Sequence, residues 1–423
     1  MARNAIGVFA VNVVGTSLTV GLQVWLARLL GVDEFGVYAY VLSWLNALLV
    51  VSLMGADSAI LRYVAALHGT GEFGRFWGFL EYIRGHVAMF SVATALALAL
   101  VVWGLGERMG VQLATAFWCG CLLLPINVLV SFNGSLLQAL KRVIQAQSLQ
   151  YVVRIGAMFG LLAILYFLLQ WRVDAIGALV VNGISGLATL IGLWWLKGRL
   201  LPLHGESVSD AKLNSEWRSA SFIFFAISGS QVLLAQVDIL IIGIFMDTTH
   251  VGLYAAASRI ATFVTFGITS INSVLAPTIS MMFARGERAE LQAVVTFASR
   301  IVLVYTIPVV LLFLVGGRWL LGWFGQEFVA AYPILVILTL GQVVIALCGS
   351  VGFLLTMTGH QNDAFKVIIS SGMLALILNL LLIPFFGLFG AAVGTMLATA
   401  VRSLTLSVLV RRRLNVRATA FGV

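Results

Sequence analysis

Residues 175–196, AIGALVVNGISGLATLIGLWWL, form an apolar segment of 22 residues without a charged side chain. A transmembrane helix needs about 20 predominantly apolar residues to cross the hydrocarbon core of a bilayer. Further apolar runs lie on both sides of this segment, at residues 5–30, 36–56, 86–104, 111–133, 148–170, 219–246, 251–279, 294–316, 330–356, 364–386 and 388–410. The sequence therefore predicts an all-α integral membrane protein with twelve transmembrane helices.

The composition of the whole chain agrees with a membrane protein. Of its 423 residues, 61% are hydrophobic and only 10% are charged, and the mean hydropathy is +1.06. An ordinary soluble domain has about a quarter charged residues, and a soluble protein of this size could not cover its surface with so few polar groups. A soluble enzyme, a nucleic-acid-binding protein and a disordered chain are therefore excluded.

No motif in the sequence predicts a catalytic centre, a metal site or another cofactor. The cysteines Cys119, Cys121 and Cys348 lie within apolar runs, so we expect neither a disulfide framework nor a metal site. The five histidines are scattered along the chain, and the loops expected on the outer side are too short to fold as a catalytic domain. We therefore do not expect an enzyme.

The distribution of basic residues predicts the orientation. The chain has 25 Lys and Arg residues against 16 Asp and Glu residues. With a cytoplasmic N-terminus, only Arg28, Arg108, Arg172 and Arg318 fall in outer loops, Arg259 falls within a span, and the other bases lie on the inner side. Because cytoplasmic loops carry an excess of Lys and Arg, we expect both termini in the cytoplasm. This bias also accounts for the net charge of +9 without a nucleic-acid partner.

A polar segment divides the predicted spans into two groups. We expect a six-helix lobe at 1–196, a cytoplasmic linker at 197–218, and a second six-helix lobe with a short basic tail at 219–423. Three pairs of motifs match in order: Gly36–Ala39 with Gly252–Ala255, Gly71–Glu72 with Gly286–Glu287, and Ile176–Ala178 with Phe389–Ala391. Such a repeat indicates a duplication. It predicts a pseudo-two-fold axis along the membrane normal and a substrate cavity between lobes that rock against each other.

Polar side chains recur along one face of the first span and one face of the seventh. They are Asn12, Thr16, Thr19 and Gln23 in the first span, and Ser228, Gln231 and Asp238 in the seventh. Polar groups that face lipid are costly, so these side chains should face protein or water. Two interpretations stay open: hydrogen bonds between helices of one lobe, or a hydrated cleft shared by both lobes. The matching positions in the two repeats favour the cleft.

Several motifs resemble one family of bacterial transporters. Leu26–Gly31 followed by Glu34–Tyr38 is similar to the opening signature of the polysaccharide flippases. These form the polysaccharide-transport branch of the superfamily that also contains multidrug-and-toxin extruders and the lipid II flippase. Further similar segments are Ala59–Ala65, Asp238–Gly243, Val251–Arg259, Pro277 and Gly387–Ala392.

The resemblance implies a function and a location. A protein of this family would move an undecaprenyl-diphosphate-linked oligosaccharide from the cytoplasmic to the outer leaflet of the bacterial inner membrane by alternating access. The product would serve cell-surface polysaccharides such as the O-antigen of lipopolysaccharide. The implied partners are this substrate, membrane lipids and other polysaccharide-assembly proteins, and we expect a monomer.

Basic side chains at membrane depth are the candidate contacts of the diphosphate, because a guanidinium suits phosphate geometry. The candidates are Arg28, Arg62, Arg154 and Arg259. Plainer alternatives exist: Arg28 could extend to the lipid headgroups, and Arg62 could anchor its helix. Arg259 could instead form an ion pair with Asp238.

The acidic candidates are Asp57 and Asp238. Each could form an ion pair or couple transport to a gradient of H⁺ or Na⁺. If acids rather than bases dominated the cavity, the chain would export a small cationic or drug-like molecule. Because bases outnumber acids at membrane depth, the sequence favours the anionic lipid-linked substrate.

Overall fold

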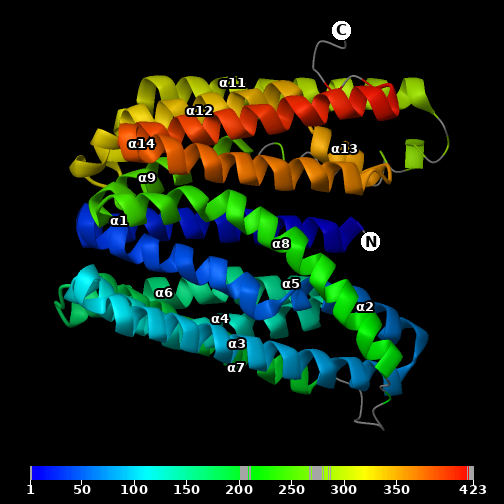
Figure 1. Ribbon diagram of the computed structural model, residues 1–423, viewed down its shortest axis with the longest axis horizontal. Helices are drawn as coiled ribbons and strands as arrows, with labels where there is room; N and C mark the ends of the chain where they lie inside the picture. Colours follow the sequence, from blue (N-terminus) through cyan, green and yellow to red (C-terminus); the bar gives the residue numbers. More distant parts are fainter. Residues whose placement is uncertain are drawn as a thin grey trace. The chain divides into compact units, whose positions relative to one another are not determined.

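The computed structural model describes residues 2–200, 208, 211–265, 268, 279, 281–283, 285, 287–416 and 418. In this part of the chain every regular element is a helix (Figure 1). The chain divides into two compact units, Met1–Val232 and Leu233–Val423, and the division falls within helix α8 (Ala211–Phe245). Within the predicted linker at 197–218, most of residues 201–210 lie outside the described residues. The side chain of Asn12 also lies outside them.

The first unit is built around α4. Its helices are α1 (Ala2–Leu53), α2 (Ala56–Thr70), α3 (Phe73–Met109), α4 (Val111–Ala139), α5 (Val143–Gln147), α6 (Arg154–Ala163) and α7 (Ala175–Gly198). Two π-helical turns, η1 (Ser148–Val153) and η2 (Ile164–Leu168), flank α6. Helix α4 packs against α1, α2, α3 and α7, and its fully buried Leu124, Leu136 and Leu137 hold it in the centre of the unit.

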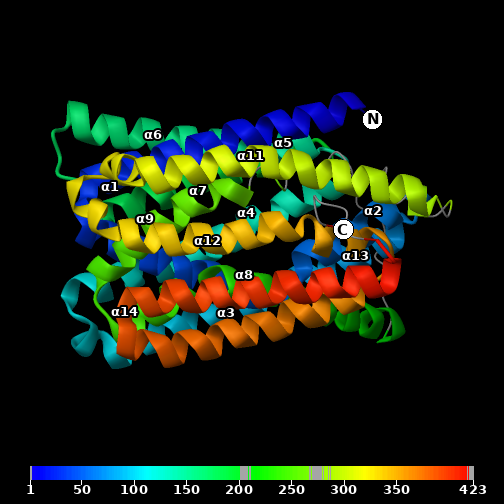
Figure 2. The same ribbon diagram turned by 90° about the horizontal axis from the view of Figure 1, so that it is seen from above.

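The second unit has α12 at its centre. Its elements are α9 (Thr248–Ala261), α11 (Arg288–Gly322), the 3₁₀ turn η3 (Gln326–Ala331), α12 (Tyr332–Cys348), α13 (Val351–Met357) and α14 (Gln361–Leu414). Helix α12 packs against α9, α11 and α14, and Figure 2 shows α11, α12 and α14 running side by side. Each helix therefore buries one side against a neighbour within its own unit.

Helices α1 and α14 are each a hairpin of two antiparallel arms. They contain 52 and 54 residues, and at about 1.5 Å per residue such a helix, if straight, would exceed twice the roughly 30 Å hydrocarbon thickness. Each is interrupted by a glycine with non-helical backbone angles, Gly31 (φ 74°) and Gly387 (φ 55°). The positive φ favours glycine, and in Figure 1 the chain reverses direction within each element.

The number of spans in the described residues is smaller than the predicted twelve. Eight helices are long and apolar enough to cross a membrane, or nine if the bent pair Ser215–Val232 and Leu234–Phe245 forms one span. The difference has a physical cause, because α1 and α14 each contain two of the predicted apolar runs in one continuous element. In addition, much of the predicted run at 251–279 lies outside the described residues. The all-helical membrane architecture is confirmed, at eight or nine candidate spans.

Large apolar side chains are exposed on the outside of the helices. Trp103, Val315 and Phe385 have relative exposures of 79%, 86% and 81%. In water such residues would favour association or aggregation. In a bilayer the same surface faces hydrocarbon, so its exposure has no hydrophobic cost.

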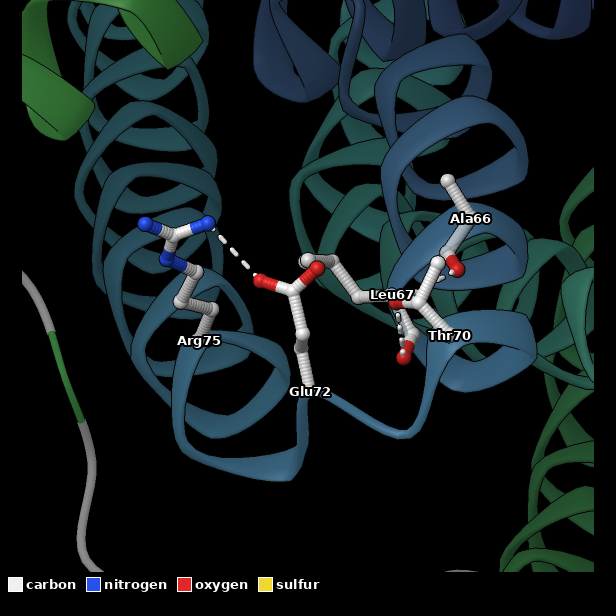
Figure 3. A network of polar contacts seen from close by, with 5 residues as sticks. All are labelled: Ala66, Leu67, Thr70, Glu72 and Arg75. Carbon is white, nitrogen blue, oxygen red and sulfur yellow. Dashed lines mark hydrogen bonds and ion pairs between the residues drawn. The ribbon is translucent and has the colours of Figure 1, made fainter.

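A short turn joins α2 to α3 at the end that we expect to face the cytoplasm. The hydroxyl of Thr70 donates to the carbonyl oxygens of Ala66 and Leu67, each at 3.3 Å, and so satisfies carbonyl groups at the end of α2. Arg75 forms an ion pair with Glu72 at 2.7 Å where α3 begins (Figure 3). Both side chains of the pair are exposed, so the pair contributes little to stability.

Candidate functional site

A half-buried arginine lies among polar side chains inside the first unit. Arg154 begins α6, and its Nη2 atom donates to Asn127 Oδ1 at 2.7 Å and to Asn182 Oδ1 at 2.9 Å. Asn182 in turn donates from Nδ2 to the Tyr38 hydroxyl at 3.3 Å. The cluster therefore joins α1, α4, α6 and α7. We call Tyr38, Asn127, Arg154 and Asn182 the arginine cluster.

The local sequence makes room for this guanidinium. The π-helical turn η1 immediately precedes Arg154, and such turns change the direction in which the following side chains point. Gly186 lies opposite, and a Cβ atom added there would meet the guanidinium at 3.7 Å and Ile126 at 3.1 Å. Asn127 follows Pro125 by two residues; it accepts a hydrogen bond from Arg154, although it could instead have satisfied the carbonyl that the proline frees.

The charge of Arg154 is not neutralised by an acid. No described carboxylate forms an ion pair with it, and the guanidinium donates to neutral amide oxygens. A charge removed from water is costly unless it is hydrogen-bonded or paired. The two charge-assisted hydrogen bonds lower this cost but leave a net positive charge inside the unit, which can attract an anion.

A buried acid occupies a polar cluster in the second unit. Asp238, on α8, is 8% exposed and accepts hydrogen bonds from the Tyr254 hydroxyl at 2.7 Å and from Asn379 Nδ2 at 2.6 Å. The Tyr254 hydroxyl also lies 3.4 Å from Thr395 Oγ1. These four residues, the aspartate cluster, come from α8, α9 and both arms of α14. The Oδ1 atom of Asn379 is buried and has no hydrogen-bond partner among the described residues.

Each cluster contains a contact of a tyrosine hydroxyl, and the two contacts lie at equivalent positions of the sequence repeat. Tyr38 and Tyr254 are 216 residues apart, as are the matching motifs that contain them. Asn182 and Thr395 are 213 residues apart, the offset of the motifs near the last span of each half. Each tyrosine hydroxyl contacts its partner, at 3.3 and 3.4 Å. The contact supports duplication, but the charges differ: the first unit holds a base and the second an acid.

The other predicted bases do not join the arginine cluster. Arg28, near the kink of α1, and Arg259, in the last turn of α9, are both exposed. Arg62 is exposed on α2, with its guanidinium carbon 5.6 Å from the centre of the Tyr63 ring. Asp238 accepts hydrogen bonds from Tyr254 and Asn379.

The side chains of the two predicted polar faces differ in exposure and in hydrogen bonding. Thr16 and Gln231 are exposed, and Ser228 is half-buried. Thr19 donates to the carbonyl of Gly15 at 2.7 Å within its own helix. Gln23 Oε1 is buried and has no partner in the part of the chain that the structure describes. Asp57 is half-buried in the first turn of α2. Of the six residues on these two faces whose side chains the structure describes, Asp238 alone belongs to one of the two clusters.

Several cluster residues were not among the sequence candidates. Asn182 and Asn379 are isolated amides in apolar segments, which is a detectable signal because an amide in a bilayer needs a partner. Tyr38 and Tyr254 lie within the matching motifs of the repeat. Thr395 carries no signal of its own, since a hydroxyl can bond to the carbonyl of its own helix.

Comparisons with known proteins agree with this architecture. Residues 1–283 match the family model described as polysaccharide biosynthesis protein. The chain is 25% identical over 412 residues to a probable low-salt glycan biosynthesis flippase, Agl15, of Haloferax volcanii, covering 96% of this chain and 82% of the relative. It is 21% identical to EpsK, an uncharacterized membrane protein of Bacillus subtilis, over 78% of this chain and 67% of the relative.

Solved structures show the same fold. An inward-facing multidrug resistance MATE family transporter of the MOP superfamily superposes with a TM-score of 0.75 at 15% identity, covering 97% of this chain and 98% of that one. The lipid II flippase MurJ in an inward closed conformation also gives 0.75, at 13% identity, covering 96% and 87%. The family match over residues 1–283 confirms the resemblance seen in the motifs: the chain belongs to the polysaccharide biosynthesis protein family.

Proposed function

We propose that the protein moves an undecaprenyl-diphosphate-linked oligosaccharide from the cytoplasmic to the outer leaflet, for a cell-surface polysaccharide such as O-antigen. Its family and the glycan flippase named among its relatives support this function. A glycan and a diphosphate cannot cross hydrocarbon unaided, so the protein must offer them a polar, cationic passage while the lipid tail stays in the bilayer. Membrane lipids and other assembly proteins would be its partners, and it would act as a monomer.

The proposed architecture has twelve spans in a bacterial inner membrane, with both termini in the cytoplasm. We count two spans in each hairpin, α1 and α14, and the remaining spans follow the apolar runs of the sequence. Lobes at 1–196 and 219–423, joined by the linker 197–218, would alternately open to the two sides of the membrane, as in transporters with parallel repeats. The basic residues of the inner loops support this orientation.

The observation that carries the proposal is the un-neutralised charge of Arg154. The arginine fork can bind phosphate oxygens in two parallel hydrogen bonds, and its present partners are amide oxygens that a phosphate could replace. We propose that Arg154 binds the diphosphate in the first unit. Arg28, Arg62 and Arg259 are proposed as further contacts along the route, where their exposed side chains can reach a headgroup.

Asp238 supports a second proposed role in the same transport cycle. Two donors, Tyr254 and Asn379, hold a carboxylate that no described base neutralises. A buried ionisable residue in a membrane span is a candidate for ion coupling, so Asp238 would bind H⁺ or Na⁺, with Asp57 as the weaker candidate. If Asp238 instead bound the cargo, the protein would be a cation-coupled exporter of small cationic molecules, as in the multidrug branch of the superfamily.

The test uses purified protein in liposomes and a fluorescent undecaprenyl-diphosphate oligosaccharide. We expect Arg154→Gln to slow flipping roughly 10- to 100-fold, because hydrogen bonds to a charged group contribute about 1.5–3 kcal/mol each and 1.4 kcal/mol is tenfold. Arg154→Lys, which keeps the charge but not the planar fork, should retain an intermediate rate. Arg142→Gln is the matched control, since Arg142 is an exposed base twelve residues earlier in the chain.

Two results would decide against the proposal. Flipping by folded Arg154→Gln protein at the wild-type rate would remove Arg154 from the transport route. Export of a small cation that depends on Asp238, with no movement of the lipid-linked oligosaccharide, would favour the multidrug-type function. The melting temperature of each variant in detergent shows whether a lost activity reflects unfolding.

A further inference from the structure

A groove of about 630 Å³ lies within the first unit, between α3, α4 and α7. Its volume falls within the roughly 300–1,000 Å³ typical of small-molecule sites. The lining is mostly apolar and includes Val92, Leu129, Ile191 and Trp194. Arg84 and Lys197 are its two charged residues among those that the structure describes. Neither cluster described above contributes a residue to it.

The apolar part of the groove suits a hydrocarbon chain. Val92, Ile191 and Trp194 are 57%, 69% and 68% exposed, so the walls are open to the side rather than closed by another helix. Arg84 and Val92 are eight residues apart on α3, which corresponds to a rise of about 12 Å along the helix. That length is close to the roughly 15 Å depth of one leaflet of the hydrocarbon core.

The two bases lie at one end of the groove. Lys197 is in the last turn of α7, and both it and Arg84 line the same groove. Neither forms an ion pair with any described residue. Two like charges that share a site repel each other, so an anion between them would be stabilising. Trp194 precedes Lys197 by one helical turn, the position of an aromatic residue at a membrane interface.

We propose that this groove binds one anionic phospholipid of the cytoplasmic leaflet. Its phosphate would lie against Arg84 and Lys197, and one acyl chain would run along Val92, Leu129 and Ile191. The orientation rests on the topology proposed above, but the site does not depend on which substrate is transported. The two bases at one end suit a phosphate, and the apolar lining is about as long as one leaflet is deep. Together these features favour a phospholipid over a water-soluble anion.

The lipid would hold the end of α7 in place. Helix α7 carries Asn182 of the arginine cluster and ends at Gly198, within the first two residues of the predicted linker. By neutralising Arg84 and Lys197, the bound headgroup would remove repulsion between α3 and α7 where both approach the interface. The site is thus expected to tune the stability of the first unit, and not to carry cargo.

Native mass spectrometry of the purified full chain tests the site, with phosphatidylglycerol as the anionic probe and phosphatidylcholine as the zwitterionic one. We expect wild-type protein to retain one phosphatidylglycerol in preference to phosphatidylcholine. The double substitution Arg84→Gln with Lys197→Gln should weaken phosphatidylglycerol binding roughly 30-fold, the loss expected for two cationic charges near a lipid headgroup. Lys141→Gln with Arg142→Gln is the matched control, because both bases are exposed and neither lines the groove.

A second variant separates the acyl chain from the headgroup. Ala88 also lines the groove on α3 and is exposed, so Ala88→Trp fills the apolar space while keeping both bases. It should release the lipid as the double substitution does, with an unchanged melting temperature in lipid-free detergent. Equal phosphatidylglycerol binding by wild-type, Ala88→Trp and double-variant proteins would overturn the site. Displacement of the lipid by undecaprenyl phosphate at equal concentration would assign the groove to the transported carrier, and would also overturn it.

Discussion

At the scale of single residues, the arginine cluster and the aspartate cluster each hold a charge on neutral partners. Arg154 is held by amide oxygens and Asp238 by a hydroxyl and an amide nitrogen. Neutral partners stabilise a charge without cancelling it, whereas a salt bridge would leave no field for a ligand to use. Each charge is therefore available for an ion of the opposite sign, an anion in the first unit and a cation in the second.

Asp238→Asn separates the coupling role from a structural one. The new amide removes a buried charge, and Asn379 can turn its unpartnered Oδ1 toward it. We expect folded protein whose melting temperature lies within about 4 °C of wild type, the shift that roughly 1 kcal/mol produces in a unit of this size. Flipping driven by a pH or Na⁺ gradient should lose its dependence on that gradient. The measurement is the flipping rate in liposomes with and without each gradient.

The comparison variant for this substitution is Asp57→Asn, because Asp57 is half-buried, belongs to neither cluster and is the weaker coupling candidate. If Asp238 is the coupling site, Asp57→Asn protein should keep its dependence on the gradient. A variant at Asp238 that still responds to the gradient like wild type would exclude this carboxylate as the coupling site. If instead Asp238→Asn fails to fold and Asp57→Asn does not, the aspartate cluster is structural.

At the scale of elements, the hairpins decide how much of the fold could be predicted. The apolar runs at 5–30 and 36–56 predict the two arms of α1, and the kink at Gly31 falls between them. The motif residue Glu34 beside that kink accepts hydrogen bonds from the backbone of Ala175 at 2.8 Å and from the side chain of Gln112. Part of the family signature therefore ties helix ends together.

The partners of Arg154 could not be predicted in the same way. Residues on a regular helix repeat every 3.6 positions, but the π-helical turn η1 widens the helix just before Arg154 and changes the face that follows it. Asn127 and Asn182 also lie 27 and 28 residues from Arg154. A pairing over such separations depends on how the helices pack, which periodicity within one helix does not contain.

The two arms of α14 approach each other closely at Gly390, so adding a single methyl group there should affect stability. A Cβ atom added at Gly390 would lie 2.3 Å from the carbonyl oxygen of Leu382, so Gly390→Ala should destabilise the hairpin by about 1–3 kcal/mol through overpacking. Gly104→Ala is the control, since a Cβ there meets nothing within 4 Å, and should be neutral or slightly stabilising. Thermal unfolding in detergent measures both, and equal melting temperatures would refute the close approach.

At the scale of the whole molecule, the proposed topology assigns opposite sides to the two ends of α4. Val111, at its start, is 85% exposed and should lie outside the cell, whereas Lys141, beyond its end, should lie in the cytoplasm. With Cys119, Cys121 and Cys348 replaced by serine, Val111→Cys should react with a membrane-impermeant maleimide in intact cells. Lys141→Cys should react only after permeabilisation. The reverse pattern would invert the orientation that the basic residues predict.

The repeated tyrosine contact, Tyr38 with Asn182 and Tyr254 with Thr395, has a consequence for the origin of the chain. An even number of crossings returns a polypeptide to its starting side, so an ancestral half-length protein could pair with a copy of itself in the same orientation. Fusion of two such genes would then free each copy to change separately. One descendant now carries an arginine and the other an aspartate beside the inherited tyrosine, a specialisation that a pair of identical subunits could not have reached.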